Sequence, residues 1–321
     1  MLATSSYKDR TVHARNANDR AAEGAILRSR LPVHEASPSC LLHIIDCLNE
    51  VDHTPRRVVS LQPSATVTLR DLGLLERLVA CTKYCADVCP EVADGSRLIV
   101  SDSWSAQAQQ IVAANPDLVL ASVPYQLEAV AEILKAGVRF LGLAPRTLAD
   151  IFMDIAAIAG VMGVAEKGTA IVDRMRRRID QVRKIAAQAP RVRVFCEEWG
   201  KPIIASQPWV AELIEAAGGE FVGVPGKSTT AEEVAAAKPD VIVAAWCGAG
   251  DRVPLEKIVE QRNWQQSSAV CNRRIFCISD ELLNTPASSL LGGLDAIAWA
   301  LDPDHFERPR GIRQIEPALG S

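Results

Sequence analysis

Histidine is missing from most of this 321-residue chain. Its five histidines are His13, His34, His43, His53 and His305, so the segment from Arg56 to Pro303 contains none. Ser-His-Asp and Cys-His nucleophiles both need an imidazole base, and neither can be built within that segment. Carriers of zinc or manganese also rely on imidazole ligands. The sequence therefore argues against such enzymes and carriers, and we expect no metal site made by the protein.

The chain also lacks sequence features of nucleotide, nucleic-acid and membrane binding. The chain has neither a GxGxxG nor a GxxxxGK[ST] motif, so nothing marks a nucleotide site. A net charge of -4 and a pI near 5.8 provide no broad basic field, so nucleic acid is not an expected partner. No apolar run approaches the roughly 20 residues that cross a bilayer, and the first residues lack the apolar core of a secretory signal. We expect no membrane insertion, and a cytoplasmic location if Met1 is the true start.

The cysteines do not suggest disulfides or a cluster. Nine is an odd number, spread through the whole chain, which favours buried, reduced thiols. Cys81, Cys85 and Cys89 are spaced four apart, which on one helix would align three thiols for an iron-sulfur cluster. Cys81, however, falls in a predicted strand and Cys89 precedes Pro90. Structural thiols are the preferred interpretation, and no cofactor is expected.

The pattern of the chain changes near Arg56. Residues 1–55 are polar and predict a poorly ordered extension. From Arg56 onward, short β-branched runs alternate with amphipathic helices, which is typical of an α/β fold with mostly parallel sheets. The predicted organisation is an α/β lobe over 56–146, connecting helices over 147–188, a second α/β lobe over 189–303, and a tail over 304–321.

Nine strands are predicted from the apolar runs. In the first lobe they are Val58–Leu61, Val79–Thr82, Leu98–Val100, Leu118–Ala121 and Arg139–Leu143; in the second they are Val192–Cys196, Ile203–Ala205, Val241–Ala245 and Ile275–Ile278. Between strands, the segments Ile111–Ala121 and Val234–Ala244 share a helix end, a Pro-Asp turn and a buried strand. After Pro208, a helix is predicted to stop at Gly218 and Gly219. The shared turn favours two similar lobes.

Two helices are predicted between the lobes. Thr147 and Asp150 suit a capping box, and Gly160 and Gly163 interrupt the helix that follows. A second helix from Val164 to about Gln188, roughly 37 Å long, could brace both lobes. Its arginines could form a phosphate-binding patch, but a solvated helix face with Asp173 and Asp180 as partners is the preferred interpretation.

The segment RRVVSLQPSATVTLRDLGLLERLVACTKYC (56–85) resembles the opening of the substrate-binding proteins of cobalamin and ferric-siderophore ABC importers, and the likeness continues to NTPASSLLGGLDAIAWALDP (284–303). This resemblance implies two Rossmann-like lobes with central parallel sheets joined by one long α-helix, the helical-backbone type of metal-chelate receptor. It also implies a monomer that binds a metal chelate without catalysis, an ABC permease as partner, and a periplasmic or cell-surface location. The Tyr84-Cys85 and Glu198-Trp199 pairs look closer to the cobalamin branch, which favours a corrinoid.

Candidate ligand-binding residues follow from the predicted fold, because the crevice of an open sheet lies at the carboxyl ends of its strands. These positions are Gln62, Pro63, Ser64, Tyr84, Ser103, Trp104, Tyr125, Trp199, Gly200, Trp246, Cys247, Leu283 and Asn284. Tyr84, Trp104, Trp199 and Trp246 could cradle a large planar ring, although each could instead pack in a core. Trp209 and Trp299 are expected to be structural, and Trp264 is undecided.

The resemblance also implies transporter-docking positions, one exposed glutamate on each lobe. Glu232 matches the second position, whereas Gln109 stands at the first. A pair of surface carboxylates mainly speeds the encounter with the transporter and fixes the orientation of the complex. Loss of one of them would therefore weaken docking.

Two other functions stay open. A cytoplasmic carrier or sensor of a corrinoid, ferric siderophore or haem could keep the same cleft without a transporter. An enzyme could use Cys85, Cys196, Glu197 or Glu198 as acid, base or nucleophile, although no second catalytic partner stands at a telling spacing.

Overall fold

The computed structural model describes residues 53–316. The predicted extension over 1–55 therefore lies outside the described residues, except for its last three. Of these, Pro55 is buried, and its carbonyl accepts a hydrogen bond from Arg77 Nη1 at 3.2 Å. The predicted tail is described as far as Glu316.

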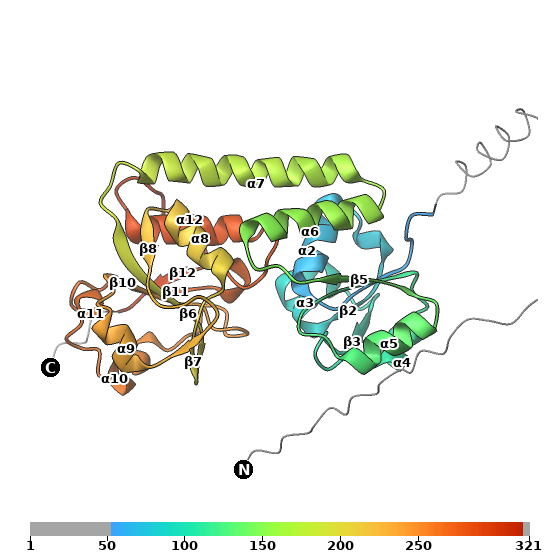
Figure 1. The fold of residues 1–321 in the computed structure, drawn as a ribbon, viewed down its shortest axis with the longest axis horizontal. Coiled ribbons are helices and arrows are strands. Elements are labelled where there is room, and N and C mark those ends of the chain that lie inside the picture. Colours follow the sequence, from blue (N-terminus) through green and yellow to red (C-terminus); the bar gives the residue numbers. More distant parts are fainter. Residues whose placement is uncertain (1–52, 317–321) are drawn as a thin grey trace, which may run out of the picture. The chain divides into compact units, whose positions relative to one another are not determined.

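The first lobe is built on a five-stranded sheet in which every strand is parallel (Figure 1). In chain order the strands are β1 (Val58–Ser60), β2 (Leu78–Thr82), β3 (Leu98–Val100), β4 (Leu118–Ser122) and β5 (Arg139–Leu143), arranged β3-β2-β1-β4-β5. The helices are α2 (Pro63–Leu72), α3 (Lys83–Val88), α4 (Ala108–Ala113) and α5 (Leu127–Lys135), with single 3-10 turns at Leu75–Arg77 and Pro90–Val92. The central strands β1 and β4 are buried along their whole length, as their unbroken apolar runs require. All five predicted strands are confirmed.

Two helices connect the lobes, α6 (Leu148–Val161) and α7 (Ala165–Ala186). The predicted capping box is present: Thr147 Oγ1 accepts from the Asp150 amide at 3.2 Å, and Asp150 Oδ2 accepts from the Thr147 amide at 2.9 Å. Gly160 was predicted to interrupt the first helix, but it lies inside α6, because only Gly163 adopts a left-handed φ, of +75°. The 22 residues of α7 span about 33 Å.

The arginines of α7 contact acidic side chains. Arg176 lies 4.0 Å from Asp173, and Arg183 lies 2.7 Å from Asp180, as the preferred interpretation of this face predicted. Arg178 reaches across to Asp295 of the second lobe at 2.8 Å. This helix face is therefore a set of solvated and inter-element ion pairs.

The second lobe has a mixed seven-stranded sheet. Its strands are β6 (Val192–Gly200), β7 (Ile203–Ala205), β8 (Gly219–Phe221), β9 (Ser228–Thr229), β10 (Val241–Ala244), β11 (Ile275–Ile278) and β12 (Ile312–Gln314). The path runs β12-β11-β10-β6-β7-β9, with β8 pairing the first half of β6. Strands β8, β6, β10 and β11 pair in parallel, whereas β7, β9 and β12 are added antiparallel. The sheet is thus parallel in its centre and antiparallel at both edges.

The helices of the second lobe are α8 (Pro208–Ala216), α9 (Ala231–Ala236), α10 (Leu255–Gln261), α11 (Ser268–Cys271) and α12 (Leu290–Leu301), with a 3-10 turn at Asp280–Leu282. Helices α8 and α12 pack against α7, and one apolar cluster contains Ile155 of α6, Met175 of α7, Leu213 of α8 and Leu294 of α12. A shared core therefore joins the connecting helices to the second lobe.

Three short strands were not predicted. Gly218 has the predicted left-handed φ, of +86°, but Gly219 opens β8 instead of completing the helix cap. Strand β9 has only two residues, and β12 lies in residues predicted to be a tail. Each strand is an edge or partial strand whose pairing comes from distant residues, so no local periodicity marks it.

The repeated Pro-Asp turn is a structural repeat. Asn115 and Lys238, which precede the two prolines, both adopt φ of +49°. After the prolines, Asp117 accepts from the Arg57 amide at 3.1 Å and Asp240 accepts from the Arg193 amide at 3.0 Å. The sequence echo therefore marks the same turn, bonded to the start of the neighbouring strand in each lobe.

Candidate functional site

A cavity of about 1270 Å³ is lined by residues of both lobes, and we call it the cleft. Its walls come mainly from the segments after β1, β2, β3 and β4 in the first lobe, and from the end of β6 and the segments after β10 and β11 in the second. These are carboxyl ends of parallel strands, where an open sheet leaves a crevice. Two other recesses, of about 590 and 420 Å³, are smaller and lie away from these strand ends.

Eight of the thirteen predicted ligand-binding residues line the cleft. They are Gln62, Pro63, Ser64, Tyr84, Trp104, Trp199, Cys247 and Asn284. The other five, Ser103, Tyr125, Gly200, Trp246 and Leu283, are not among its lining residues.

Three aromatic side chains of the cleft are unusually exposed. Tyr84 is 42% exposed and Trp104 48%, with their ring centroids 5.8 Å apart at an angle of 36°. Across the cleft, Trp199 is 45% exposed, and its Nε1 donates to the Lys201 carbonyl at 2.9 Å. Exposing such large apolar rings to water is costly unless a ligand covers them.

Trp246, predicted to belong to this aromatic group, is not among the lining residues of the cleft. Its Nε1 donates to Glu197 Oε1 at 2.7 Å, and its ring lies so close to Gly200 that a Cβ there would stand 2.4 Å from Cζ2. Glu197 is fully buried and pairs with Arg262 at 2.7 Å. Trp246 is therefore partly buried, packed on Gly200 and against the core of the second lobe.

The other three tryptophans are buried or packed against the core. Trp209, expected to be structural, is 8% exposed and lines the cleft from the start of α8, while its Nε1 donates to the Leu283 carbonyl at 2.9 Å. Trp264 is buried, bonded to the Ala231 carbonyl at 3.1 Å, with the Arg262 guanidinium 4.9 Å from its ring centre. Trp299 packs edge-on against Phe276, as expected for a structural residue.

The remaining predicted residues lie behind the lining. Ser103 is buried, and its hydroxyl accepts from Gln62 Nε2 at 3.2 Å. Tyr125 packs edge-on against Phe140 and donates to the Leu143 carbonyl. Leu283 is fully buried in the main core. Ser103 thus bonds a lining residue, Tyr125 bonds the end of β5, and Leu283 packs in the core.

The charged part of the lining was not predicted as ligand-binding, although Glu198 was considered as a catalytic residue. It comprises Lys83, Asp87, Asp102, Glu198, Arg252, Asp280 and Glu281. Most of these residues stand within a few positions of a predicted strand end, so a wider window around those ends would have included them. Asp280 also shapes the wall, because its carboxylate accepts from the Gly248 amide at 2.7 Å and the Gly250 amide at 2.8 Å.

The residues considered for catalysis are engaged in structural contacts. The Cys85 thiol is buried beside Thr82, whose hydroxyl donates to it at 3.2 Å. Burial raises the pKa of Cys196 to about 12, and its sulfur accepts from Ser206 at 3.2 Å. Glu198 lines the cleft; burial raises its pKa, while a 2.6 Å hydrogen bond from Gln207 opposes that rise. The Cys196 thiol is therefore protonated at neutral pH. Of the two glutamates, only Glu198 lines the cleft.

The other cysteines follow the prediction in part. Five of the seven in the described part of the chain are buried, but Cys247 and Cys271 are exposed. Residues 53–316 contain no group of three or more His, Cys, Asp or Glu placed to hold a metal ion. Within the same residues, no helix is both long and apolar enough to span a membrane.

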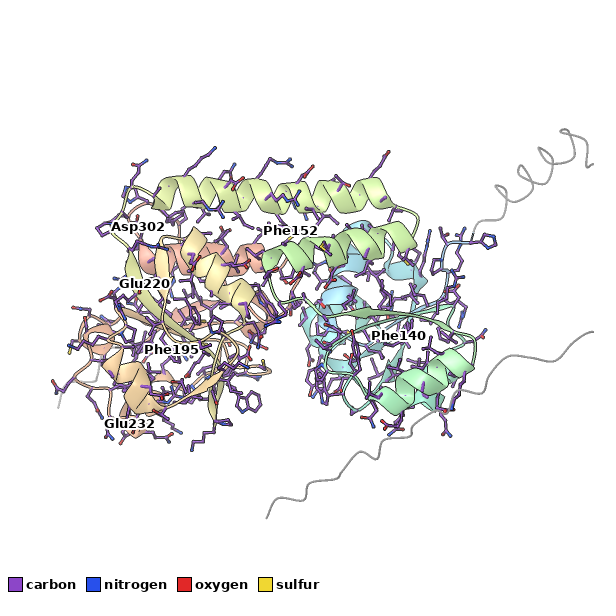
Figure 2. All side chains as sticks on the ribbon, in the orientation of Figure 1. Phe140, Phe152, Phe195, Glu220, Glu232 and Asp302 are labelled. Carbon is purple, nitrogen blue, oxygen red and sulfur yellow. The ribbon has the colours of Figure 1, made fainter. Side chains whose placement is uncertain are left out.

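The two predicted docking positions are exposed. Gln109 lies on α4, and Glu232 lies in the first turn of α9, where Figure 2 labels it. The ribbon shows α4 and α9 on the side away from α7 (Figure 1).

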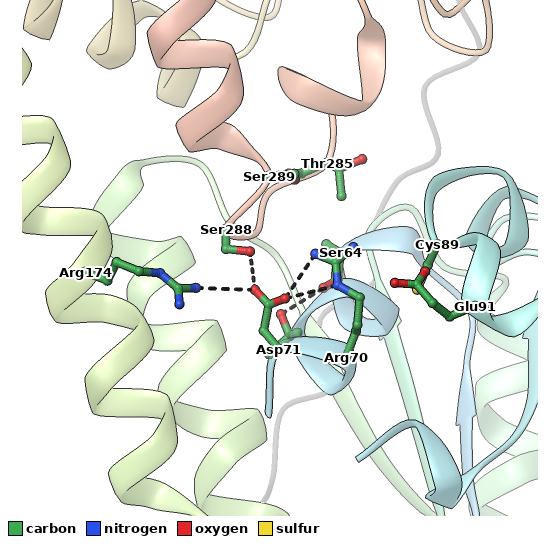
Figure 3. Close-up of polar contacts among 10 residues, drawn as sticks. Ser64, Arg70, Asp71, Cys89, Glu91, Arg174, Thr285, Ser288 and Ser289 are labelled. Carbon is green, nitrogen blue, oxygen red and sulfur yellow. Dashed lines mark hydrogen bonds and ion pairs between the residues drawn. The ribbon is translucent and has the colours of Figure 1, made fainter. Parts of the chain in front are cut away.

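Behind the cleft, Asp71 at the end of α2 links three elements, as Figure 3 shows. It accepts a hydrogen bond from Ser288, which precedes α12 in the second lobe, and lies 3.8 Å from Arg174 of α7. Arg70 adds a bond at 3.0 Å. We call these four residues the Asp71 clasp. It joins α2, whose first residues line one wall of the cleft, to the segment 284–288, whose residues Asn284, Thr285 and Pro286 line the other.

Comparison with known proteins agrees with this architecture. Residues 58–282 match the periplasmic binding protein family. The chain is 26% identical over 260 residues to the vitamin B12-binding protein of Vibrio cholerae serotype O1, covering 76% of this chain and 88% of that protein. It is 22% identical over 266 residues to an uncharacterized ABC transporter substrate-binding lipoprotein of Bacillus subtilis, with 79% and 82% covered.

A solved structure shares the fold. The periplasmic heme binding protein of Pseudomonas aeruginosa superposes with a TM-score of 0.74 at 19% identity, covering 83% of this chain and 100% of that one. The predicted α/β fold of two lobes joined by a long helix is therefore confirmed. With the family match spanning well over half of its residues, this chain belongs to the periplasmic binding protein family.

Proposed function

We propose that this chain captures a large metal chelate, a corrinoid first of all, in the cleft and presents it unchanged to the permease of an ABC importer. The observation that carries the proposal is the cleft itself, about 1270 Å³ in volume, with exposed aromatic rings on both of its walls. Cavities for drug-sized ligands measure about 300–1000 Å³. A cleft of this size therefore suits a ligand larger than most cofactors.

The aromatic rings support a ligand with broad apolar faces. Tyr84 and Trp104 present a tilted pair from the first lobe, and Trp199 and Trp209 contribute from the second. Planar macrocycles bury much apolar area against such rings. Similarity to a vitamin B12-binding protein favours a corrinoid over haem or a ferric siderophore.

The cleft also favours binding over turnover. Its one half-buried carboxyl of catalytic interest, Glu198, is held by Gln207, and both buried thiols considered as nucleophiles lie outside the lining. We propose that the protein needs no cofactor of its own. For delivery, Glu232 would meet a basic group of the permease, with Gln109 supplying a weaker, uncharged contact on the first lobe.

The test is a tryptophan-fluorescence titration of the purified chain with cyanocobalamin, haemin and ferrichrome, corrected for ligand absorbance and repeated by calorimetry. We expect saturable binding of cyanocobalamin at micromolar concentration or tighter. Mass spectrometry after incubation should recover the ligand intact. Binding of none of the three, or a chemically altered ligand, would refute the proposal.

Variants locate the binding site. Trp104→Ala and Trp199→Ala each remove an exposed ring from one wall, and each should weaken binding about tenfold or more, because ring burial contributes roughly 1.5–3 kcal/mol. Met153→Ala on α6 is the matched control, since Met153 is 68% exposed and does not line the cleft. An equal loss in the control would place the ligand elsewhere.

A further inference from the structure

The charged side chains of the cleft are strongly unequal in sign. Five carboxyl groups line it, two from the first lobe and three from the second: Asp87, Asp102, Glu198, Asp280 and Glu281. They therefore face a bound ligand from both walls.

Only two basic side chains share this lining, Lys83 and Arg252, which leaves a formal balance of -3. Within residues 53–316, no Lys or Arg lies at ion-pair distance from any of the five carboxyl groups. Where these groups have partners, the partners are neutral: Asp280 accepts from backbone amides, and Asp102 accepts from Ser105 Oγ at 2.6 Å. Neutral donors hold a carboxylate in place without cancelling its charge.

Charges of one sign in a concave site with low-dielectric walls focus their field on whatever enters. An anionic ligand group would be repelled there, and its desolvation would not be compensated by a cation. Amide N–H groups, in contrast, find carboxylate acceptors on both walls.

We infer that the cleft selects chelates by the charge of their edge groups, accepting those with carboxamide or cationic edges and rejecting those with carboxylates. This inference rests on the proposed capture function and narrows it to a ligand class. It also ranks the macrocycles: a corrinoid with amide side arms should bind better than a porphyrin with two carboxylates.

Matched probes separate charge from shape. Cyanocobalamin is compared with the same corrinoid after hydrolysis of one propionamide to a carboxylate, by calorimetry at low and high salt. We expect the carboxylate form to bind about tenfold more weakly at low salt, and the difference to shrink in 0.5 M salt, since screening shortens the reach of the charges. A second set, ferrioxamine B and its N-acetyl and N-succinyl derivatives, varies the charge on one iron chelate from +1 to -1.

Two substitutions test the source of the selectivity. The double variant Asp87→Asn, Glu281→Gln removes one charge from each wall and should reduce the preference for the amide corrinoid to about threefold or less. The matched control, Glu128→Gln with Glu260→Gln, removes the same charge from exposed positions on α5 and α10 outside the cleft and should keep the full preference.

The outcomes distinguish the two proposals. Equal affinity for the amide and carboxylate corrinoids, or an unchanged preference in the cleft variant, would overturn the charge inference while leaving capture intact. If cyanocobalamin does not bind but the ferrioxamines follow the order of their charges, the inference holds and the corrinoid assignment fails. Failure of every probe to bind refutes capture, and the inference with it.

Discussion

Asp154 on α6 makes the stability of the fold depend on pH. Burial and the neighbouring Asp150 raise its pKa from 3.8 to about 6. The folded state therefore holds this proton more tightly than the unfolded state, and the unfolding free energy falls as pH rises from about 4 to about 6. Above about pH 6, Asp154 is ionised, and its partly buried carboxylate keeps the free energy of unfolding lower.

Asp154→Asn should remove that cost. We expect the variant to be more stable than the parent by about 1 kcal/mol at pH 7, after allowance for the partial exposure of the group, and equal to it below pH 4. Urea unfolding at pH 4, 5.5 and 7 measures the difference. Asp173→Asn on α7, where the side chain is 47% exposed, serves as the control. A gain in stability that is the same at all three pH values would contradict this explanation.

At the scale of elements, the crossing of α6 and α7 depends on Gly168. A Cβ built there would lie 2.4 Å from the Cβ of Ala159, closer than real side chains approach. The two helices pack over much of their length, and α7 also contacts α8 and α12. Their separation therefore bears on the core that joins both lobes.

Gly168→Leu should push α6 and α7 apart and lower the unfolding free energy by about 1–3 kcal/mol, the usual range for overpacking. Thr169→Leu places the same side chain at the next residue, which is exposed, and should change stability little. Denaturant titrations of both variants decide between packing and a general effect of leucine on α7. Similar losses in the two variants would exclude the close approach as the cause.

At the scale of the whole molecule, the Asp71 clasp joins the two walls of the cleft. Asp71 is largely buried, with 13% of its side chain exposed, and it contacts Ser288 across 217 positions of sequence. The shared apolar core holds the lobes behind the cleft, whereas this clasp bonds α2 directly to the segment that carries Asn284, Thr285 and Pro286.

Asp71→Asn should loosen that connection without unfolding the lobes. We expect faster hydrogen exchange in residues 283–290, and weaker ligand binding by several-fold, because the walls are no longer held at one separation. Ser288→Ala should produce a similar change, and the double variant should add little to either. Additive effects, or unchanged exchange in that segment, would show that the two residues do not act together.

Features that depend on residues close in sequence were predicted correctly. The apolar runs marked every central strand, because a parallel strand buried on both faces needs an unbroken apolar stretch such as Leu118–Ser122. The sequence also predicted the Thr147–Asp150 capping box and the two Pro-Asp turns, since both are short local motifs. Positions after strand ends located eight lining residues of the cleft.

Tertiary structure decided the rest. Trp246 and Trp199 both follow strands predicted from the sequence. In the structure, Trp246 packs on Gly200 beside buried Glu197, which Arg262 pairs, while Trp199 is 45% exposed in the cleft. Residues far along the chain set this difference. Strand β12 and the Asp71–Ser288 contact likewise exist only through distant partners. The sequence by itself determined the central strands, the connecting helices and the family, because these depend on local periodicity and short motifs. Which side chains face the cleft, and the excess of acidic groups there, depended on how the two lobes come together.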